Sequence, residues 1–368
     1  MAGAAAALAM PARAGNEKLV WAGLLHLGGN MWDDYDADPD GWAKSYEESL
    51  ERPNPKGPFG TVSRYCSYLR CDDAVWRRTT DAAARSGCNL LFIDLGEGLV
   101  YPSHPELAVA GSWSVEKLRK ELDRLRTMGL EPIPKLNFSA THDSWLKDYH
   151  HMLSTARYYQ VVADLIRDVC EIFGHPRFFH IGFDEESAGD QHNNFHTTVR
   201  QGDLWWHDLN YVIGQVEKNG AQAVMWSDKL WYGKQEFLAR MSKGVVQANW
   251  YYRADFSEAA LAWKPEFEKP PHKGWPEKIH GAAAFLVLQE AGFRQLPCAS
   301  NYFEDGSVSE LVRFCKARLD PANLVGFCMA PWAYSVPDAQ VDGKDSKGET
   351  ATLRGFEQFA AAKRLFVG

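Results

Sequence analysis

Eight short apolar runs, each followed by a helix-like segment, constrain the fold of this chain more than any other feature. Each run ends in glycine, proline or polar residues, which is typical of strands separated by loops. The predicted strands cover residues 18–26, 88–95, 130–137, 177–187, 221–228, 245–251, 295–302 and 324–332. The first strand is followed by a long polar loop, residues 27–65, and long loops in compact domains are often functional.

The segments between these runs are predicted to be helices. In residues 115–125, for example, apolar residues recur at the spacing that places them on one helix face. The predicted helices cover residues 72–86, 114–127, 154–173, 199–218, 234–242, 276–292 and 353–365, and one more begins at residue 307. Ser114 and Ser154 are predicted N-caps, and Ser307 with Glu310 is predicted to form a capping box.

Eight alternating strand–helix units without a linker indicate a single (β/α)8 TIM barrel that covers residues 17–368. A doubly wound open sheet would also alternate. Such a sheet usually carries a glycine-rich phosphate loop after an early strand, and the LGGN segment at residues 27–30 is too weak a match. The single barrel is therefore the predicted fold.

The composition limits the partners and the location of the protein. A net charge of −8, with no cluster of basic residues, argues against a nucleic-acid partner. No segment is apolar for long enough to insert into a membrane as a helix. Residues 1–16 are rich in alanine and resemble the end of an export signal, so we expect an exported protein, or else a disordered leader.

The seven cysteines do not predict a metal site, because their spacings match no zinc motif. Their odd number leaves at least one thiol outside any disulfide, and Cys66 and Cys71 are close enough in sequence to bridge. Four of them, Cys88, Cys170, Cys315 and Cys328, lie in apolar patterns and are predicted to be core residues.

The stretch from Arg177 to Ser187, RFFHIGFDEES, carries the strongest chemical signal. Successive strand residues point to opposite faces, so its apolar residues share one face while His180 and Asp184 share the other. The alternation relaxes where a strand ends, so Asp184 and Glu185 could both turn into one pocket. Two adjacent carboxylates repel each other, and this repulsion favours the protonated form of one of them, as a general acid requires. The alternative is a solvated acidic turn.

In a TIM barrel the site lies at the carboxyl ends of the strands, and these ends combine polar with aromatic residues. The residues at the strand ends are His26, Trp32, Asp94, Glu97, Lys135, Asn137, His142, Asp184, Glu185, Trp226, Asp228, Asn249, Trp250, Tyr251, Asn301, Tyr302 and Trp332. This mixture fits a carbohydrate better than a phosphate ester, since there is no arginine cluster to hold a phosphate. Without a paired-histidine motif, we expect neither a metal nor another cofactor.

The chain resembles glycoside hydrolase family 20, the β-N-acetylhexosaminidases, and the related β-N-acetylgalactosaminidase families. Residues 180–185, HIGFDE, look like the family's H-x-G-G-D-E strand. Weaker similarities follow in the family's order over residues 88–332: the YPSHPEL loop at 101–107, the proline-to-histidine segment at 133–142, NYFE at 301–304, and the glycine-to-tryptophan segment at 326–332. The resemblance implies a glycan or glycoconjugate substrate and a retaining, substrate-assisted mechanism.

The resemblance also implies a role for each site residue. Glu185 would be the general acid and then the base, and Asp184 would hold the N–H of the sugar's 2-acetamido group. The acetamido oxygen would be the nucleophile, forming an oxazolinium intermediate, and Tyr302 would donate a hydrogen bond to it. The remaining predicted substrate-binding or supporting residues are Trp226, Trp250, Trp332, His142, His180, Asp94, Asn137, Asp228, Asn301 and His26.

Three departures from the family pattern affect these expectations. Phe183 replaces the second glycine of the motif and, by its parity, should face the helices. The first strand lacks the family's sugar-binding arginine, and no acid follows Trp332. Those two groups would read the outer hydroxyls of the sugar, so GalNAc is slightly favoured over GlcNAc.

Two alternatives remain open at the level of sequence. One is a two-carboxylate glycosidase acting on sugars without an acetamido group, in which Asp94, Glu97 or Asp228 would be the second carboxylate. The other is a glycan-binding barrel without catalytic activity, since this fold hosts many functions.

Overall fold

The structure, a computed structural model, describes residues 19–31, 65–187, 200–268, 276–338 and 348–368. The predicted leader at residues 1–16, Trp32 and most of the predicted long loop at residues 27–65 lie outside the described residues.

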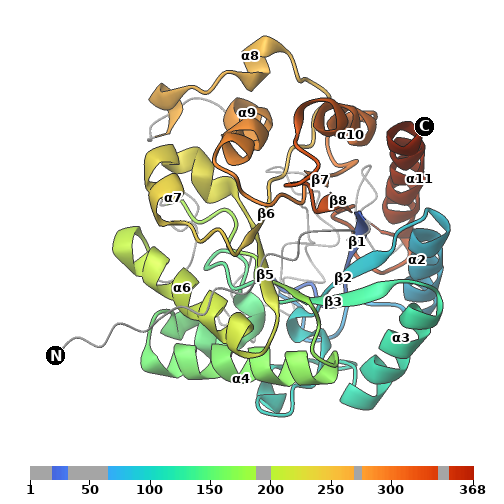
Figure 1. Ribbon diagram of the computed structural model, residues 1–368. Helices are drawn as coiled ribbons and strands as arrows, with labels where there is room; N and C mark the ends of the chain where they lie inside the picture. Colours follow the sequence, from blue (N-terminus) through green and yellow to red (C-terminus); the bar gives the residue numbers. More distant parts are fainter. Residues whose placement is uncertain (1–18, 32–64, 188–199, 269–275, 339–347) are drawn as a thin grey trace, which may run out of the picture.

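Eight parallel strands form one sheet in the order β6-β5-β4-β3-β2-β1-β8-β7. Figure 1 looks along the axis of this sheet, with the strands at the centre and the helices around them. The strands are β1 Val20–His26, β2 Leu90–Asp94, β3 Glu131–Lys135, β4 Phe178–His180, β5 Gln222–Trp226, β6 Val246–Ala248, β7 Cys298–Ala299 and β8 Gly326–Met329. Every strand residue is buried except the first residues of β3 and β5, as expected for a parallel sheet covered by helices.

Backbone hydrogen bonds join the two edge strands, β6 and β7, beyond their formal bounds. The N–H of Gln247 donates to the carbonyl oxygen of Arg294 at 2.9 Å, and Leu296 N–H donates to Gln247 O at 3.0 Å. Cys298 N–H donates to Asn249 O at 2.8 Å. These bonds close the ring, so the predicted single (β/α)8 barrel is confirmed.

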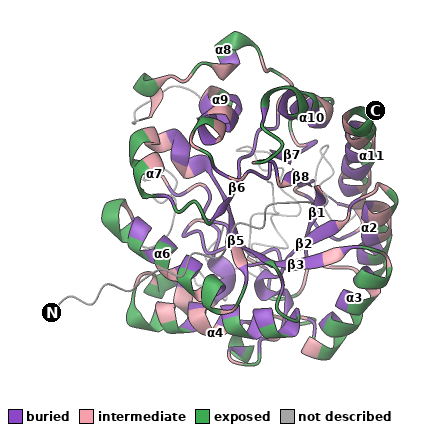
Figure 2. Cartoon of the chain, viewed as in Figure 1, coloured by how far each residue is buried: buried purple, intermediate pink, exposed green. Residues whose placement is uncertain are grey.

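The helices cover the outside of the barrel, with buried residues toward the strands and exposed residues toward solvent (Figure 2). Helix α11 lies beside both α2 and α10, so the end of the described chain packs next to its first helix (Figure 1). The α-helices are α2 Asp73–Arg85, α3 Val115–Thr127, α4 Ala156–Ile172, α6 Gly202–Lys218, α7 Lys234–Arg240, α8 Glu258–Leu261, α9 Pro276–Glu290, α10 Ser307–Arg318 and α11 Glu349–Val367. Short 3-10 helices are η2 Gly96–Gly98, η3 Pro105–Leu107, η4 Ser144–Met152, η5 Asp228–Tyr232 and η6 Pro265–Phe267.

Two of the three predicted helix N-caps are not formed in the structure. Ser114 caps α3 as predicted, accepting a hydrogen bond from Lys117 N–H. Ser154 does not cap α4: Thr155 does, while the Ser154 hydroxyl donates to Asp208 Oδ2 at 2.6 Å. The prediction failed because two adjacent residues could both cap, and a carboxylate on α6 bonds the first of them.

The predicted capping box of α10 is also wrong. Ser307 is the first residue of the helix, after Gly306, and its hydroxyl donates to the carbonyl oxygen of Ser300 at 2.6 Å. Glu310 instead pairs with Arg313 one turn later. The serine therefore ties the start of the helix to the segment after β7.

The predicted core cysteines Cys88, Cys170, Cys315 and Cys328 are buried. No disulfide joins any of the seven cysteines, all of which lie in described residues. Among the helices that the structure describes, none has the length and apolar character needed to cross a membrane.

Candidate active site

The segment after β4 turns sharply, and this turn brings the acidic pair together. Regular strand structure ends at His180, earlier than predicted, because Gly182, Phe183 and Glu185 all have left-handed backbone conformations, with φ of 75°, 66° and 53°. Asn137 explains the glycine, since a Cβ on Gly182 would lie 1.9 Å from its Oδ1. Non-glycine residues adopt this conformation at a cost, and such strain clusters at functional sites.

Asp184 and Glu185 meet at one histidine, His142. Its Nε2 lies 3.3 Å from Glu185 Oε2, and its Nδ1 lies 3.7 Å from Asp184 Oδ1. Asn137 Nδ2 also donates to Asp184 Oδ1, at 3.0 Å. The Asp184 side chain is only 12% exposed, whereas that of Glu185 is 33% exposed. Glu185 is thus the carboxylate that both water and a ligand can reach.

His142 carries a positive charge at neutral pH. Burial alone would lower its pKa, but the neighbouring carboxylates of Asp184 and Glu185 raise it to about 9. The imidazolium therefore compensates the charge of Asp184 and, when Glu185 is ionised, that of Glu185 as well.

Asp228, the first residue of η5, contacts the pair from the next strand. Its Oδ2 accepts the backbone N–H of Glu185 at 2.9 Å. Its side chain is fully enclosed, and its Oδ1 has no hydrogen-bond partner among the described residues. Burial, followed by the nearby charge of Asp184, raises the pKa of Asp228 well above its usual value. Both effects favour the protonated form of Asp228, whose ionised form would place a third negative charge in this space.

Glu186, the third acid of the run, turns away from the site. Its carboxylate contacts the guanidinium of Arg200, the indole N–H of Trp205 and the backbone N–H of Ala140, all buried. Phe183 turns the same way, as its parity predicted: its ring lies 4.6 Å from the Arg200 guanidinium and 5.7 Å from the Trp205 ring of α6. This side of the turn anchors the motif to the helix layer.

A buried ion cluster lies at the ends of β1, β2 and β3. Lys135 Nζ lies 2.5 Å from Asp94 Oδ2, and His26 Nδ1 lies 3.1 Å from the same oxygen. Burial alone would raise the pKa of Asp94, but Lys135 and His26 lower it to about 2. The strand ends thus place His26 and Asp94 together, with Lys135 as the counter-ion of Asp94.

Glu97 is held by the backbone after β1. It accepts hydrogen bonds from Gly29 N–H at 2.8 Å and from Asn30 N–H at 3.1 and 3.2 Å, and it is fully buried. Each of these three carboxyl groups is held in its own environment: Asp94 in an ion cluster, Glu97 in a backbone cradle, and Asp228 in an enclosed position that favours its protonated form. These environments disfavour each of them as the second carboxylate of an ordinary glycosidase.

The predicted tryptophans form one continuous cluster of aromatic rings, in which Trp226 and Trp250 are buried and Trp332 is partly buried. The Trp226 ring lies 4.4 Å from His180 and 5.8 Å from Trp332, measured between ring centroids. Trp332 in turn lies 6.4 Å from Tyr252, which stacks on Trp250 at 5.1 Å. Trp332 also has a left-handed backbone, with φ of 52°.

Tyr252 is a site residue that sequence reasoning missed. We expected its neighbour Tyr251 at the rim, but the Tyr251 hydroxyl donates to the carbonyl oxygen of Asp255 and its ring packs on Phe256. The alternation of strand residues could have identified Tyr252, because it lies two positions after Trp250 and shares its face.

His180 and Asn301 are placed away from the acidic pair. His180 Nδ1 accepts the N–H of Gly182 at 3.1 Å, so it supports the turn through the backbone. Burial and the charge of Lys135 lower its pKa well below the usual value, which keeps the ring neutral. Asn301 Nδ2 donates to Ala351 O in α11 at 2.9 Å, toward the helix layer. Its neighbour Tyr302 is partly buried against the core.

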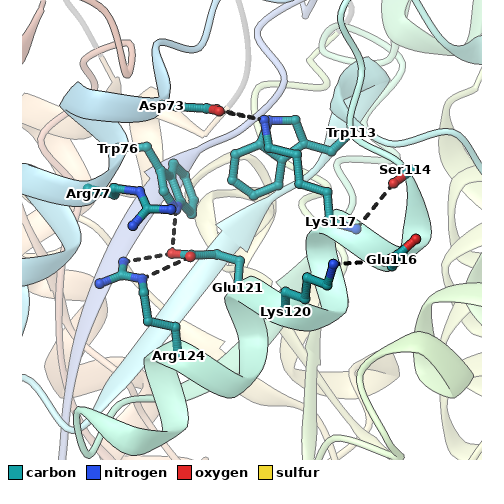
Figure 3. A pocket seen from close by; sticks show the side chains of 10 residues that line it. All are labelled: Asp73, Trp76, Arg77, Trp113, Ser114, Glu116, Lys117, Lys120, Glu121 and Arg124. Carbon is teal, nitrogen blue, oxygen red and sulfur yellow. Dashed lines mark hydrogen bonds and ion pairs between the residues drawn. The ribbon is translucent and has the colours of Figure 1, made fainter.

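Within the described ranges, no group of three or more His, Cys, Asp or Glu side chains is arranged to hold a metal ion. A hollow of about 400 Å³ lies elsewhere, on the outside of the barrel between α2 and α3 (Figure 3). Its polar and charged groups bind one another. Trp76 Nε1 donates to Glu121 at 2.8 Å, and Lys117 pairs with Asp73 at 2.7 Å. The hollow is thus a charge-compensated surface groove.

Comparison with solved structures supports the barrel fold of this chain. No protein-family model and no curated protein matches the sequence. Among solved structures, the β-N-acetylhexosaminidase of Bacteroides fragilis NCTC 9343 aligns with a TM-score of 0.56 at 12% identity, over 93% of this chain and 65% of that one. The chain therefore shares the barrel fold of this structure. It spans just under two thirds of the Bacteroides enzyme.

Two further structures agree. The family 20 catalytic modules of the pneumococcal exo-β-D-N-acetylglucosaminidase StrH align with a TM-score of 0.52 at 14% identity, over 81% of this chain and 82% of that one. The Streptomyces plicatus N-acetyl-β-hexosaminidase aligns with a TM-score of 0.50 at 13% identity, over 94% and 69% of the two chains. The similarity thus extends over most of the barrel.

Proposed function

We propose that this protein is a retaining exo-β-N-acetylhexosaminidase that releases a terminal β-linked N-acetylhexosamine by substrate-assisted catalysis. The observation that carries the proposal is the acidic pair after β4, in which Asp184 and Glu185 share the charged His142. The pair stands at the carboxyl ends of the strands of a barrel that has the fold of family 20 catalytic modules.

Glu185 is the proposed general acid and base. It is the more exposed of the two carboxylates, so it can reach the glycosidic oxygen and then a water molecule. In the first step Glu185 donates its proton to the leaving oxygen while the bond between that oxygen and the anomeric carbon breaks. In the second step it removes a proton from water, which attacks the anomeric carbon while the bond between that carbon and the acetamido oxygen breaks.

Asp184 is the proposed partner of the substrate's acetamido group. Asn137 and His142 both contact its Oδ1, so Oδ2 is the oxygen we assign to the acetamido N–H. This hydrogen bond orients the acetamido oxygen toward the anomeric carbon, where it forms the new C–O bond of the oxazolinium intermediate. The nucleophile is then part of the substrate, which is consistent with the bound states of Asp94 and Asp228.

The aromatic cluster of Trp226, Trp332, Tyr252 and Trp250 is the proposed wall around the sugar. Trp226 and Trp332 lie side by side, and Tyr252 links Trp332 to Trp250. Flat apolar rings of this kind pack against the apolar face of a pyranose. Tyr302 is the proposed donor to the acetamido oxygen.

GalNAc is the proposed preferred sugar, slightly ahead of GlcNAc. The sequence has neither an arginine on the first strand nor an acid after Trp332, the two groups that the family uses to read the outer hydroxyls. His26 and Asp94 occupy that side of the barrel, and the His26 ring lies 5.7 Å from Trp332.

The test is hydrolysis of nitrophenyl β-glycosides of GalNAc, GlcNAc, galactose and glucose by the wild type, Asp184→Asn and Glu185→Gln. Glu116→Gln, an exposed acid on α3, is the control. We expect cleavage of the acetamido sugars only, and collapse of activity in both site variants. Equal turnover of galactose or glucose would instead support a two-carboxylate glycosidase, and no turnover by the wild type would support a binding barrel.

A further inference from the structure

Phe303 is a large apolar side chain that remains 43% exposed although it directly follows Tyr302. A single exposed apolar residue is ordinary. Phe303 differs because its ring is held in place: Tyr302 packs edge-on at 4.7 Å, and the guanidinium of Arg253 lies 4.7 Å from its centroid. The ring orientation is therefore fixed before any ligand arrives.

The loops that carry Phe303 and Arg253 are fastened together by buried and polar contacts. Arg253 Nε donates to Glu277 Oε2 at 2.9 Å, and Glu277 Oε1 accepts the backbone N–H of Tyr252 at 3.0 Å. From the other loop, the Glu304 carboxylate accepts the backbone N–H of Ala254. A platform built in this way loses little conformational entropy when a ligand binds.

An aromatic path connects this platform with the proposed site. Phe303 lies 6.3 Å from Tyr252, which lies 6.4 Å from Trp332, measured between ring centroids. Phe303 is thus the exposed outer end of the aromatic cluster, and Trp226 and Trp332 are its inner end. A molecule that extends from the inner sugar toward solvent would meet Phe303 next.

We propose that Phe303 and Arg253 form a second carbohydrate-binding position, which holds the sugar on the leaving-group side of the scissile bond. This inference rests on the proposed function. The ligand class follows from the charges: Glu277 compensates Arg253, so the position suits a neutral pyranose and not an anion. The sugar ring stacks on Phe303, and the terminal nitrogens of Arg253 donate hydrogen bonds to the hydroxyls of that sugar.

The test compares two substrates of the preferred N-acetylhexosamine: its methyl β-glycoside and a β-linked disaccharide with a second hexosamine. Phe303→Ala should lower kcat/KM for the disaccharide by about tenfold by raising KM, and should leave kcat/KM for the methyl glycoside within about twofold of the wild type. Phe303→Tyr keeps an aromatic ring and should behave as the wild type. Leu204→Ala, which removes a similarly exposed apolar side chain on α6, is the control.

Two results would overturn the inference. Equal loss on both substrates would show that Phe303 only supports Tyr302, and no loss on either would show that it binds nothing. Calorimetric titration of the Glu185→Gln protein with disaccharide and monosaccharide separates this inference from the proposed function. If the wild type hydrolyses neither substrate, the titration still tests the second position. Only a second sugar-binding position would make the Glu185→Gln protein bind the disaccharide more tightly than the monosaccharide and lose that preference when Phe303→Ala is added.

Discussion

Asp228 Oδ2 accepts the backbone N–H of Glu185 at 2.9 Å, which joins the strained turn after β4 to the start of η5. Glu185 has φ of 53°, a conformation that costs a residue with a side chain about 1–2 kcal/mol. The hydrogen bond opposes this cost, and it fixes the direction in which the Glu185 side chain leaves the backbone. The raised pKa of Asp228 favours its protonated form, so an uncharged acceptor fits this role.

The first prediction follows from this preference of Asp228 for its uncharged form. Asp228→Asn retains an oxygen that accepts the Glu185 N–H, so we expect kcat/KM to stay within about threefold of the wild type. Asp228→Ala removes the acceptor from a buried donor, which costs about 1–3 kcal/mol, and should lower kcat/KM by about ten- to a hundredfold. Steady-state kinetics on the preferred nitrophenyl glycoside measures both.

The same pair of variants tests the two-carboxylate alternative. If Asp228 were the nucleophile or base, the amide would be as damaging as alanine, since it cannot supply a carboxylate. A collapse of activity in Asp228→Asn, in a protein that remains folded, would therefore contradict the role assigned here.

The second prediction separates two adjacent acids. Glu185→Gln removes a proton donor at a partly exposed position, so kcat should fall by about 10²- to 10⁴-fold with little change in the free energy of unfolding. Glu186→Gln removes the nearer of two buried acidic partners of Arg200, which leaves Asp208 at 3.8 Å, and should cost about 3–5 kcal/mol of unfolding free energy. Denaturant unfolding and steady-state kinetics on both proteins decide; an inactive but fully stable Glu186→Gln would reverse the assignment.

The barrel could be predicted because its signal is repeated along the whole chain. Eight strand-like runs alternate with amphipathic segments, and the structure orders those strands into one closed ring. The acidic pair was predictable for a related reason, since one strand carries both its apolar face and its carboxylates. Details that depend on a neighbour in space were not: Ser154 bonds Asp208 on α6 instead of capping α4.

The site shows the same division between local pattern and tertiary contact. That Asp184 and Glu185 occur together is visible in the sequence, but the raised pKa of Asp228 depends on burial and on the nearby charge of Asp184. The direction of Asn301 depends on a carbonyl of α11 about fifty residues later. Distances of this kind come only from the folded chain.

The third prediction concerns Phe183, which stands where the family motif has glycine. Its φ of 66° strains any residue with a side chain, while its ring is buried against Arg200 and Trp205. Both Phe183→Ala and Phe183→Gly lose that packing, which costs about 3–5 kcal/mol. Glycine also removes the strain, so Phe183→Gly should be more stable than Phe183→Ala by about 1 kcal/mol. Chemical denaturation checks this order, and a more stable alanine variant would show that the turn is not strained.

The fourth prediction is a pH dependence of stability that arises from His142. Its pKa is raised to about 9 in the folded protein, against 6.5 for an ordinary histidine, so the folded state binds the proton more tightly. The stability that this proton contributes is fully present below about pH 6.5 and is lost as the pH rises through about 9. Its full value is about 3 kcal/mol.

Measurement of that dependence requires a difference between two proteins, because other groups also titrate. The unfolding free energy of the wild type minus that of His142→Gln should shrink as the pH rises from about 6 to about 9.5. In the background of Asp184→Asn and Glu185→Gln, which removes the two carboxylates that raise the histidine pKa, the difference should vary much less with pH. A difference that stays constant across this range in the wild-type background would mean that His142 is neutral, and the acidic pair would then need another source of compensating charge.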